Sequence, residues 1–206
     1  GVMEQGKFNP TTVGTPQGGV ISPLLANIVL NLLDWALHKA GYQFVRFADD
    51  FVVVCASYSQ AQEARVLVQQ VLEKELGLTL SPEKTVITDF QKGYEFLGFW
   101  ISSRLKRMRD KSVQKFKEKI RKQTVRRHNF DARLIEKLNA IIRGTANYFA
   151  TAFSTNRWKF QKLDSWIRMR LRAMKFKRKN YDDNKKLSVN YFRHKVHLLT
   201  LKEFCT

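Results

Sequence analysis

The most informative stretch of the chain is RFADDFVVV, residues 46–54, in which two adjacent carboxylates separate two apolar segments. Asp49 and Asp50 fall at a tight turn, so the stretch predicts a β-hairpin. Adjacent carboxylates repel one another and need a cation or solvent nearby. The flanking strands read as buried, which favours a pair of Mg²⁺ ions (or Mn²⁺) and hence phosphoryl transfer. A solvated turn is the simpler alternative, because aspartate is common in turns.

A glycine-rich segment, GTPQGGVISPLLAN, precedes this turn at residues 14–27. Ser22 suits the N-cap of a helix and Pro23 its first turn, so a helix is predicted from Pro23 to about Lys39, ended by Gly41. Since this helix is apolar nearly all round, we expect it to be buried beneath a sheet. The glycines would let the loop approach a phosphate, although a plain connection would share this composition.

Four segments, in this order, resemble motifs of the reverse transcriptases encoded by group II introns. They are Gly14–Asn27, Phe47–Asp50 (with Phe where Tyr is more usual), Gly77–Thr85 and Phe96–Phe99. Residues 142–149, IRGTANYF, look like part of the thumb, or maturase, domain. The resemblance implies an α+β fold: the C-terminal part of a polymerase palm, with a split β-α-β sheet and buried helices, followed by a basic helical-bundle thumb.

The resemblance also implies a catalytic centre. Asp49 would hold Mg²⁺ that activates the 3′-hydroxyl of a primer and steadies the leaving pyrophosphate, with Asp50 supporting it as a second metal-site carboxylate. Lys84 is a candidate to neutralise or protonate pyrophosphate, or else an ordinary surface lysine. Leu97 and Gly98 would form the primer grip, with backbone placed beneath the primer.

Five further residues are assigned to nucleotide and template binding by the resemblance. Pro16, Gln17 and Gly18 would lie near the incoming nucleotide and the template base. Phe47 and Ala48 would shape the catalytic turn under the primer terminus.

One feature departs from the family pattern. Polymerases of this class hold their metals with a further Asp from an earlier palm strand, and the only acidic residue ahead of Gly14 is Glu4, in a polar setting. The fingers motifs are also absent. We therefore expect the chain to lack the fingers and the first palm strand, and to be inactive as a polymerase by itself.

The charge divides the chain into three parts. Residues 1–103 carry 7 basic and 10 acidic side chains, residues 104–180 carry 25 and 5, and residues 181–206 carry 5 and 3. We predict a palm, a basic thumb and a basic tail or thumb extension over these ranges. The excess of bases after Ser103 favours nucleic-acid binding over a solvated face or an anionic membrane surface. The candidate contact residues are Arg121, Lys122, Arg126, Arg127 and Arg143.

Local patterns predict the remaining elements. Strands are expected at Tyr42–Arg46 and Phe51–Cys55, a helix from a Ser59–Gln62 capping box to Leu76, and a second hairpin from Thr85–Phe90 and Tyr94–Ile101. Three apolar stripes at helical spacing then predict a small antiparallel bundle, with Trp166 in its core. The stripes are Val113–Phe116–Ile120, Leu134–Leu138–Ile141–Thr145–Phe149 and Leu163–Trp166–Ile167–Leu171–Met174.

The sequence thus predicts an RNA-directed DNA polymerase whose partners are a structured intron RNA template, a DNA primer and deoxynucleoside triphosphates. The alternatives are a maturase that binds RNA and assists splicing without significant polymerase activity, or a reverse transcriptase of a CRISPR or phage-defence system. Two cysteines without metal-ligand spacing fit a reducing compartment. No signal or membrane-spanning segment is visible, so a cytoplasmic (bacterial-type) or organellar protein without a membrane partner is expected.

Overall fold

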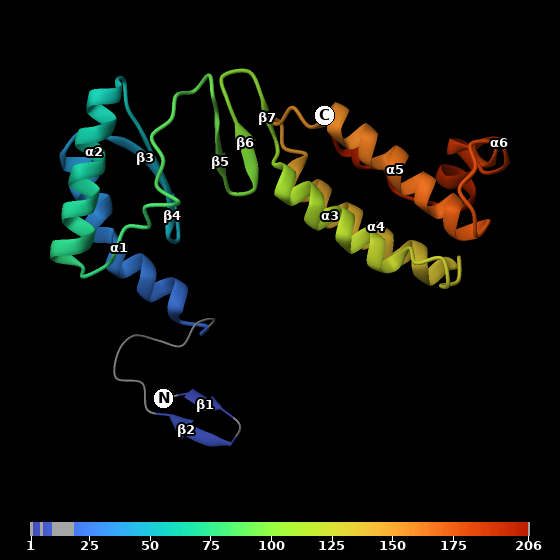
Figure 1. The fold of residues 1–206 in the computed structure, drawn as a ribbon, viewed down its shortest axis with the longest axis horizontal. Helices are drawn as coiled ribbons and strands as arrows, with labels where there is room; N and C mark the ends of the chain where they lie inside the picture. Colours follow the sequence, from blue (N-terminus) through green and yellow to red (C-terminus); the bar gives the residue numbers. More distant parts are fainter. Residues whose placement is uncertain (1, 5, 10–18, 206) are drawn as a thin grey trace. The chain divides into compact units, whose positions relative to one another are not determined.

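The computed structural model describes residues 2–4, 6–9 and 19–205 and combines helices with small antiparallel sheets (Figure 1). The α+β class predicted from the sequence is confirmed. The chain divides into two compact units, residues 1–88 and 89–206, each with its own hydrophobic core. The charge boundary after Ser103 therefore does not coincide with the boundary between the compact units.

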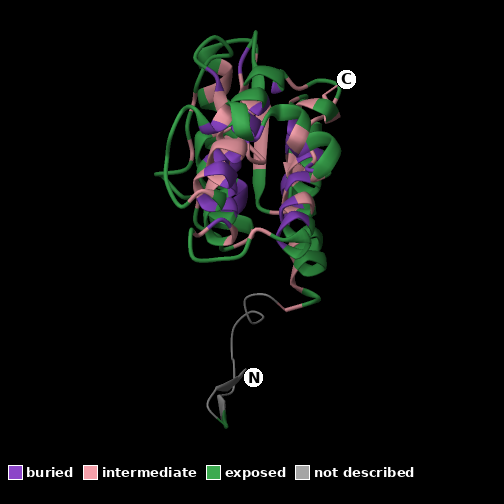
Figure 2. Ribbon diagram, turned by 90° about the vertical axis from the view of Figure 1, so that its right-hand side faces the viewer, coloured by how far each residue is buried: buried purple, intermediate pink, exposed green. Residues whose placement is uncertain are grey.

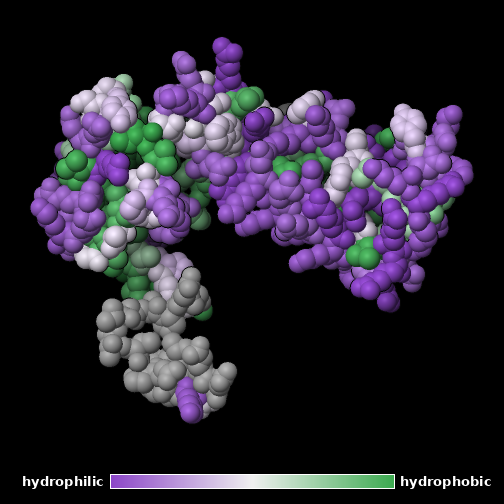
Figure 3. Space-filling view, viewed as in Figure 1, coloured by the Kyte–Doolittle hydropathy of each residue, from purple (hydrophilic) through white to green (hydrophobic). Residues whose placement is uncertain are grey.

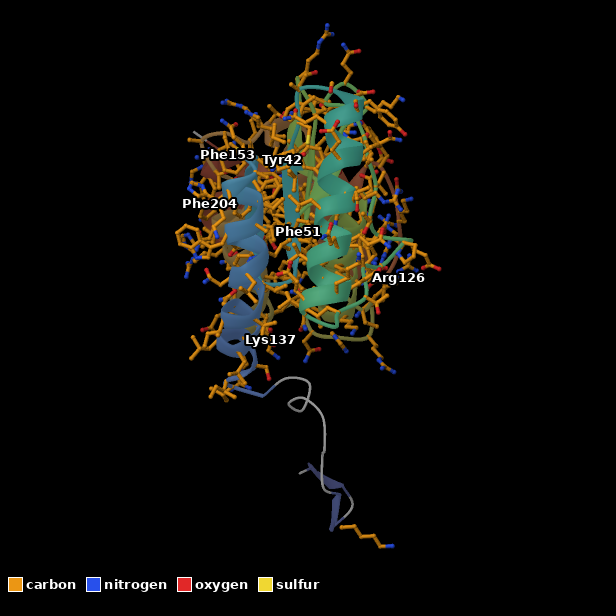
Figure 4. The ribbon with its side chains drawn as sticks, turned by 90° about the vertical axis from the view of Figure 1, so that its left-hand side faces the viewer. Tyr42, Phe51, Arg126, Lys137, Phe153 and Phe204 are labelled. Carbon is orange, nitrogen blue, oxygen red and sulfur yellow. The ribbon has the colours of Figure 1, made fainter. Side chains whose placement is uncertain are left out.

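The first unit is a hairpin covered on one face by helices. Its elements are β1 (Val2–Glu4), β2 (Lys7–Asn9), α1 (Ser22–Lys39), β3 (Gln43–Phe47), β4 (Asp50–Val54), α2 (Tyr58–Gln70) and a π-helical turn η1 (Val71–Glu75). Its core is formed by Leu30, Leu33, Leu37, Val68, Val71 and Leu72. Tyr42 and Phe51 pack against this core, and Figure 4 shows both between α1 and α2.

Helix α1 matches the predicted range but is buried on one side only. Three of its 18 residues are buried, whereas Leu24, Ile28, Leu32 and Trp35 expose more than half of their side-chain surface. The expected burial beneath a sheet is therefore found on one face of the helix only, because none of the described elements covers its second face.

The ends of α1 follow the predicted chemistry in part. The N-cap is Ile21, so Ser22 lies inside the helix and is not the cap as predicted. Gly41 ends the helix as predicted, with φ of 77°. The amides of Gly41 and Tyr42 donate to the carbonyls of His38 and Leu37, which is the Schellman arrangement.

Helix α2 begins two residues earlier than its predicted capping box. Ser57 is the N-cap: its side chain accepts a hydrogen bond from the Gln60 amide, while Gln60 Oε1 accepts one from the Ala56 amide at 2.6 Å. The predicted Ser59–Gln62 box is wrong, because Ser59 already lies within the helix whereas Ser57 has the extended backbone that a cap requires.

The second predicted hairpin is shifted along the chain. Residues 85–90 form no strand; instead β5 (Tyr94–Phe96) pairs with β6 (Phe99–Ile101), and β6 pairs with β7 (Lys106–Met108). The reversal falls at Leu97 and Gly98 because glycine accepts the left-handed backbone needed there, with φ of 82°. The β3–β4 and β5–β7 sheets are separate, so the expected single split sheet is not formed among the described residues.

The second unit packs the β5–β7 sheet with a helical bundle. The helices are α3 (Asp110–Gln123), α4 (Ala132–Phe149) and α5 (Arg157–Lys175), followed by α6 (Asp183–Lys186) and the short turns η2 (Tyr191–Lys195) and η3 (Leu201–Phe204). Its core is formed by buried residues of all three long helices, and Figure 2 colours the buried residues purple.

The predicted stripes are largely confirmed as the buried faces of these helices. The stripe on α3 is buried as predicted. On α4, Ile142 and Ala146 are buried, whereas the predicted Ile141 and Thr145 are half-buried. On α5, Phe160 joins the core and Trp166 is only half-buried beside it.

The segment after α5 also contributes to this core. Leu187, Phe192, Leu198 and Leu201 are buried against the bundle. The carboxylate of Asp164 accepts hydrogen bonds from the Leu201 and Lys202 amides at 2.8 and 3.0 Å, and burial raises the pKa of this group. Residues 187–204 are thus folded onto the bundle. None of the helices described is long and apolar enough to cross a bilayer.

Candidate active site and nucleic-acid interface

The β3–β4 hairpin has one packed face and one open face. Antiparallel pairing places Phe44 opposite Val53 and Arg46 opposite Phe51. Phe44, Phe51 and Val53 pack against the helices of the first unit. Because side chains alternate along a strand, Phe47 and its partner Asp50 lie on the other face. Phe47 is 65% exposed and Asp50 is exposed, so this face remains open.

Ala48 and Asp49 form the two-residue turn of this hairpin. Ala48 has φ of 53°, a left-handed conformation that is unfavourable for residues other than glycine. Asp49 and Asp50 are both exposed. The expectation of buried flanking strands is therefore wrong: the strands are half-buried, and solvent can relieve the repulsion between the two carboxylates.

Arg46 joins this turn to helix α1. Its Nε and Nη2 donate to the two carboxylate oxygens of Asp34, at 2.8 and 2.5 Å. Its Nη1 donates to Asn27 Oδ1 at 2.8 Å and to the carbonyl of Ala48 at 2.9 Å. The hydrogen bonds to Asp34 raise the pKa of Arg46 above its ordinary value. Sequence reasoning did not assign Asp34 or Asn27 to the site, because periodicity says nothing about polar pairs between a helix and a later strand.

Of the predicted catalytic and nucleotide-binding residues outside the hairpin, Lys84 is the one that falls within the described residues. Pro16, Gln17 and Gly18 lie outside the described residues. Lys84 is exposed in the loop after η1. In the part of the chain that the structure describes, no hydrogen bond or ion pair joins Lys84 to the Asp49–Asp50 turn.

The Leu97–Gly98 turn is bonded to α3 and α4 in the second unit. Tyr148 Oη donates to the Leu97 carbonyl at 2.9 Å, and the Gly98 carbonyl accepts from the Arg109 amide at 3.0 Å and from Ser112 Oγ at 3.2 Å. A Cβ atom on Gly98 would lie 3.3 Å from both the Phe149 ring and Ser112 Oγ. Glycine is therefore favoured here both by its left-handed backbone, with φ of 82°, and by the close packing of its neighbours.

The predicted basic residues lie on the surface of the second unit. Hydrophilic residues cover most of the visible face of this unit in Figure 3. All five candidates are exposed, and none forms an ion pair with a described acidic residue. They are Arg121, Lys122, Arg126, Arg127 and Arg143. Arg143 lies apart from the others in sequence, in a shallow hollow on α4 beside Glu136 and His197.

Cations are crowded near the C-terminal end of α3. Lys117, Arg121 and Arg170 lie 5.7, 5.6 and 5.5 Å from the ring centre of Trp166. Burial, and then the charges of Arg121 and Arg126, lower the pKa of Arg170. Crowded cations without acidic partners create a positive surface suited to a phosphate backbone.

The donor set at the Asp49–Asp50 turn fits a divalent cation in part. Carboxylate oxygens are the ligands that Mg²⁺ and Mn²⁺ prefer, and such ions are commonly held by one or two carboxylates together with substrate phosphates and water. No group of three His, Cys, Asp or Glu side chains comes together within the described residues. The turn thus supplies two ligands that would need completion by substrate or by another carboxylate.

A carboxylate-bearing hairpin and a basic helical bundle are features that an α+β protein acting on nucleic acids would need. Residues 2–101 match the family model for reverse transcriptase (RNA-dependent DNA polymerase), and residues 113–192 match that for the group II intron maturase-specific domain. The chain belongs to the family of group II intron reverse transcriptases and maturases, as the sequence motifs predicted.

Three curated relatives illustrate this membership. Protein YkfC of Escherichia coli K12 is 33% identical, across 48% of this chain and 35% of that protein. Group II intron-encoded protein LtrA of Lactococcus lactis subsp. cremoris is 26% identical, across 61% and 31%. The putative COX1/OXI3 intron 1 protein of Saccharomyces cerevisiae is 29% identical, across 73% and 24%. The chain spans about a third or less of the length of these relatives.

Proposed function

We propose that the protein containing this chain is an RNA-directed DNA polymerase of group II intron type. It would transfer nucleotides to the 3′-hydroxyl of a DNA primer on an RNA template, and would bind intron RNA and assist its splicing. The observation that carries the proposal is the Asp49–Asp50 turn on an open hairpin face within the segment matched to reverse transcriptases.

The Asp49 and Asp50 carboxylates would hold Mg²⁺ or Mn²⁺ together with substrate phosphates. Two bound ions would lower the pKa of the primer hydroxyl and stabilise charge on the leaving pyrophosphate. Phe47 supports this assignment, since its exposed ring lies on the same face as Asp50, where a primer terminus could contact it. Ala48 would fix the direction in which the turn presents both carboxylates.

The remaining assignments follow from the family resemblance. Residues 16–18, which are Pro, Gln and Gly, would contact the incoming nucleotide and template base, and Lys84 would approach the pyrophosphate. Leu97 and Gly98 would present backbone to the primer; the bonds that hold their carbonyls support a rigid turn. Residues 1–103 would act as palm, residues 104–180 as thumb, and residues 181–206 as its extension.

The basic surface would bind the RNA–DNA duplex or intron RNA. Arg121, Lys122, Arg126 and Arg127 lie at the C-terminal end of α3 and in the loop that follows. Duplexes that contain RNA are recognised largely through phosphates, 2′-hydroxyls and shape. The surface would therefore bind with little dependence on base sequence.

A maturase without significant polymerase activity is the second candidate. It is favoured by the match of residues 113–192 to the maturase-specific domain and by the two-carboxylate donor set, which is incomplete among the described residues. A binding protein of this kind would not need Asp49 or Asp50, so these residues separate the two candidates.

The test is primer extension by the full-length protein with Asp49→Asn, which preserves volume but removes a metal-binding charge. We expect extension to fall by on the order of 10³-fold or more, with RNA affinity nearly unchanged. Glu75→Gln is the matched control, because Glu75 is exposed in the same unit and should leave extension intact. Substantial extension by Asp49→Asn would contradict the metal assignment.

A further inference from the structure

The catalytic turn has little packing to hold it. Asp49 and Asp50 are exposed, Phe47 projects from the open face, and Ala48 has a left-handed backbone that costs free energy for an alanine. A strained backbone persists only when its surroundings hold it in place. The fixed position of these carboxylates must therefore come from the packed face of the hairpin.

Arg46 is the charged residue on that packed face. Four hydrogen bonds run from its guanidinium to Asp34, Asn27 and Ala48, so four of the five N–H donors of an arginine are used. Asp34 and Asn27 both belong to α1, and the Ala48 carbonyl belongs to the turn itself. Its side chain is only 11% exposed, which strengthens the charge-assisted bonds to Asp34.

These contacts place one rigid group between α1 and the turn. The planar guanidinium donates two parallel hydrogen bonds to Asp34, and this pairing fixes the orientation of the guanidinium. With the plane fixed, Nη1 is directed at both Asn27 and the Ala48 carbonyl. A lysine could form a single ion pair with Asp34. It lacks the planar guanidinium whose several donors bind Asp34 and the turn at the same time.

We propose that Arg46 is a positioning residue that fixes the Asp49–Asp50 carboxylates for divalent-cation binding, with Asp34 and Asn27 as its anchors on α1. The inference rests on the proposed function of this turn. Arg46 does not touch the substrate: it acts through the Ala48 carbonyl and the conformation of the turn.

The experiment compares Arg46→Lys with Arg65→Lys in the full-length protein. Arg65 is exposed on α2 of the same unit and serves as the matched control. Three properties are measured: Mn²⁺ affinity by electron paramagnetic resonance, hydrogen exchange of residues 43–54, and the temperature of unfolding. Asp49→Asn gives the reference for a lost cation site.

We expect Arg46→Lys to weaken Mn²⁺ binding about tenfold and to accelerate exchange at residues 47–50, while the unfolding temperature and the rest of the exchange pattern stay close to those of Arg65→Lys. In primer extension, kcat should fall and KM for the template–primer should not change. Asp34→Asn removes one of the two acceptor oxygens of the anchor but keeps Arg46 and its other acceptors, so it should give a smaller change in the same direction.

Unchanged Mn²⁺ affinity in Arg46→Lys, with binding lost in Asp49→Asn, would overturn the positioning role and leave the proposed function intact. A loss of binding that only follows global unfolding, in Arg46→Lys and in Asp34→Asn alike, would also overturn it, because Arg46 would then be merely structural. Mn²⁺ affinity unchanged in Asp49→Asn would overturn the proposed metal site itself, and with it this inference.

Discussion

Two hairpin turns, one in each unit, place a residue other than glycine in the left-handed region, but they are held in different ways. Ala48 has φ of 53° and Leu97 has φ of 46°. The Ala48 carbonyl is bonded to a guanidinium that is anchored by an ion pair. The Leu97–Gly98 turn is bonded by neutral hydroxyls and a backbone amide, and is packed beside Phe149.

This difference predicts which kinds of substitution each turn tolerates. A turn that presents exposed carboxylates on an open face cannot be fixed by packing on that face. Its conformation therefore depends on the charge and the planar shape of the Arg46 guanidinium. A turn enclosed by aromatic rings depends on the volume of its neighbours. Changes of charge should therefore disturb the first turn, and changes of size should disturb the second.

The two units differ in surface charge as well. Residues 1–88 carry 6 basic and 8 acidic side chains, whereas residues 89–206 carry 31 and 10. The first unit has the charge pattern suited to binding cations, and the second has the pattern suited to binding polyanions. If this division is correct, removing bases from one unit should affect affinity far more than removing them from the other.

The largest expected effect tests the difference in charge between the two units. Replacing Arg121, Lys122, Arg126 and Arg127 with Gln should lower RNA–DNA duplex affinity on the order of 10²- to 10³-fold at low salt, because fewer counterions are released on binding. The slope of log affinity against log salt should become shallower by about 3. The fold should persist, since these side chains are exposed and lie off the buried face of α3.

The matched control replaces four exposed bases of the first unit with Gln, which changes the total charge equally. These residues are Lys7, Lys39, Arg65 and Lys74. Duplex binding measured over a series of salt concentrations compares the two variants. Equal slopes for both would mean that total charge, and not the surface near α3, drives binding.

The second effect tests the enclosed turn. Gly98→Ala should destabilise the protein by about 2–3 kcal/mol, because it combines a left-handed backbone with a Cβ crowded against Phe149 and Ser112. Gly41→Ala is the control: its φ is 77°, but no atom lies within 4 Å of the added Cβ, so about 1 kcal/mol is expected. Urea unfolding measures both, and equal losses would show that packing around Gly98 contributes nothing.

Local sequence signals predicted the elements that short-range chemistry determines. The β3–β4 hairpin, the Gly41 helix end and the buried stripe on α3 all follow from periodicity and backbone preference. The second hairpin was misplaced because residues 85–90 pair with no strand and the chain reverses instead at Leu97–Gly98, within the segment predicted to be a single strand. The one-sided burial of α1 was missed because composition does not say which elements will cover a helix.

The sequence assigned the candidate site to Asp49 and Asp50, an assignment that stays a prediction, and it did not predict the residues that hold their turn in place. Asp49 and Asp50 were identified from the motif, but their exposure was not, since apolar flanking strands can be packed on one face only. Arg46 bonds to a helix residue 12 positions away, and Tyr148 bonds to a turn 51 positions away. Such pairs depend on tertiary packing, which no periodic pattern in the chain encodes.

The smallest expected effect concerns the Ala48–Asp49 turn of the first unit. Ala48→Gly removes the Cβ that makes φ of 53° unfavourable, worth about 1–2 kcal/mol, but gives the unfolded chain extra freedom worth about 0.4–1 kcal/mol. The net result should be a stabilisation of about 0.5–1 kcal/mol in urea unfolding. Ala56→Gly, at an exposed position without positive φ, should instead destabilise by about 0.5 kcal/mol. If the hydrogen bond from Arg46 to the Ala48 carbonyl keeps the turn in a strained conformation that catalysis needs, Ala48→Gly should extend primers a few-fold more slowly despite its greater stability. The reason is that its turn can leave the productive conformation more easily. A variant both stabler and equally active would show that the strain at Ala48 serves no function.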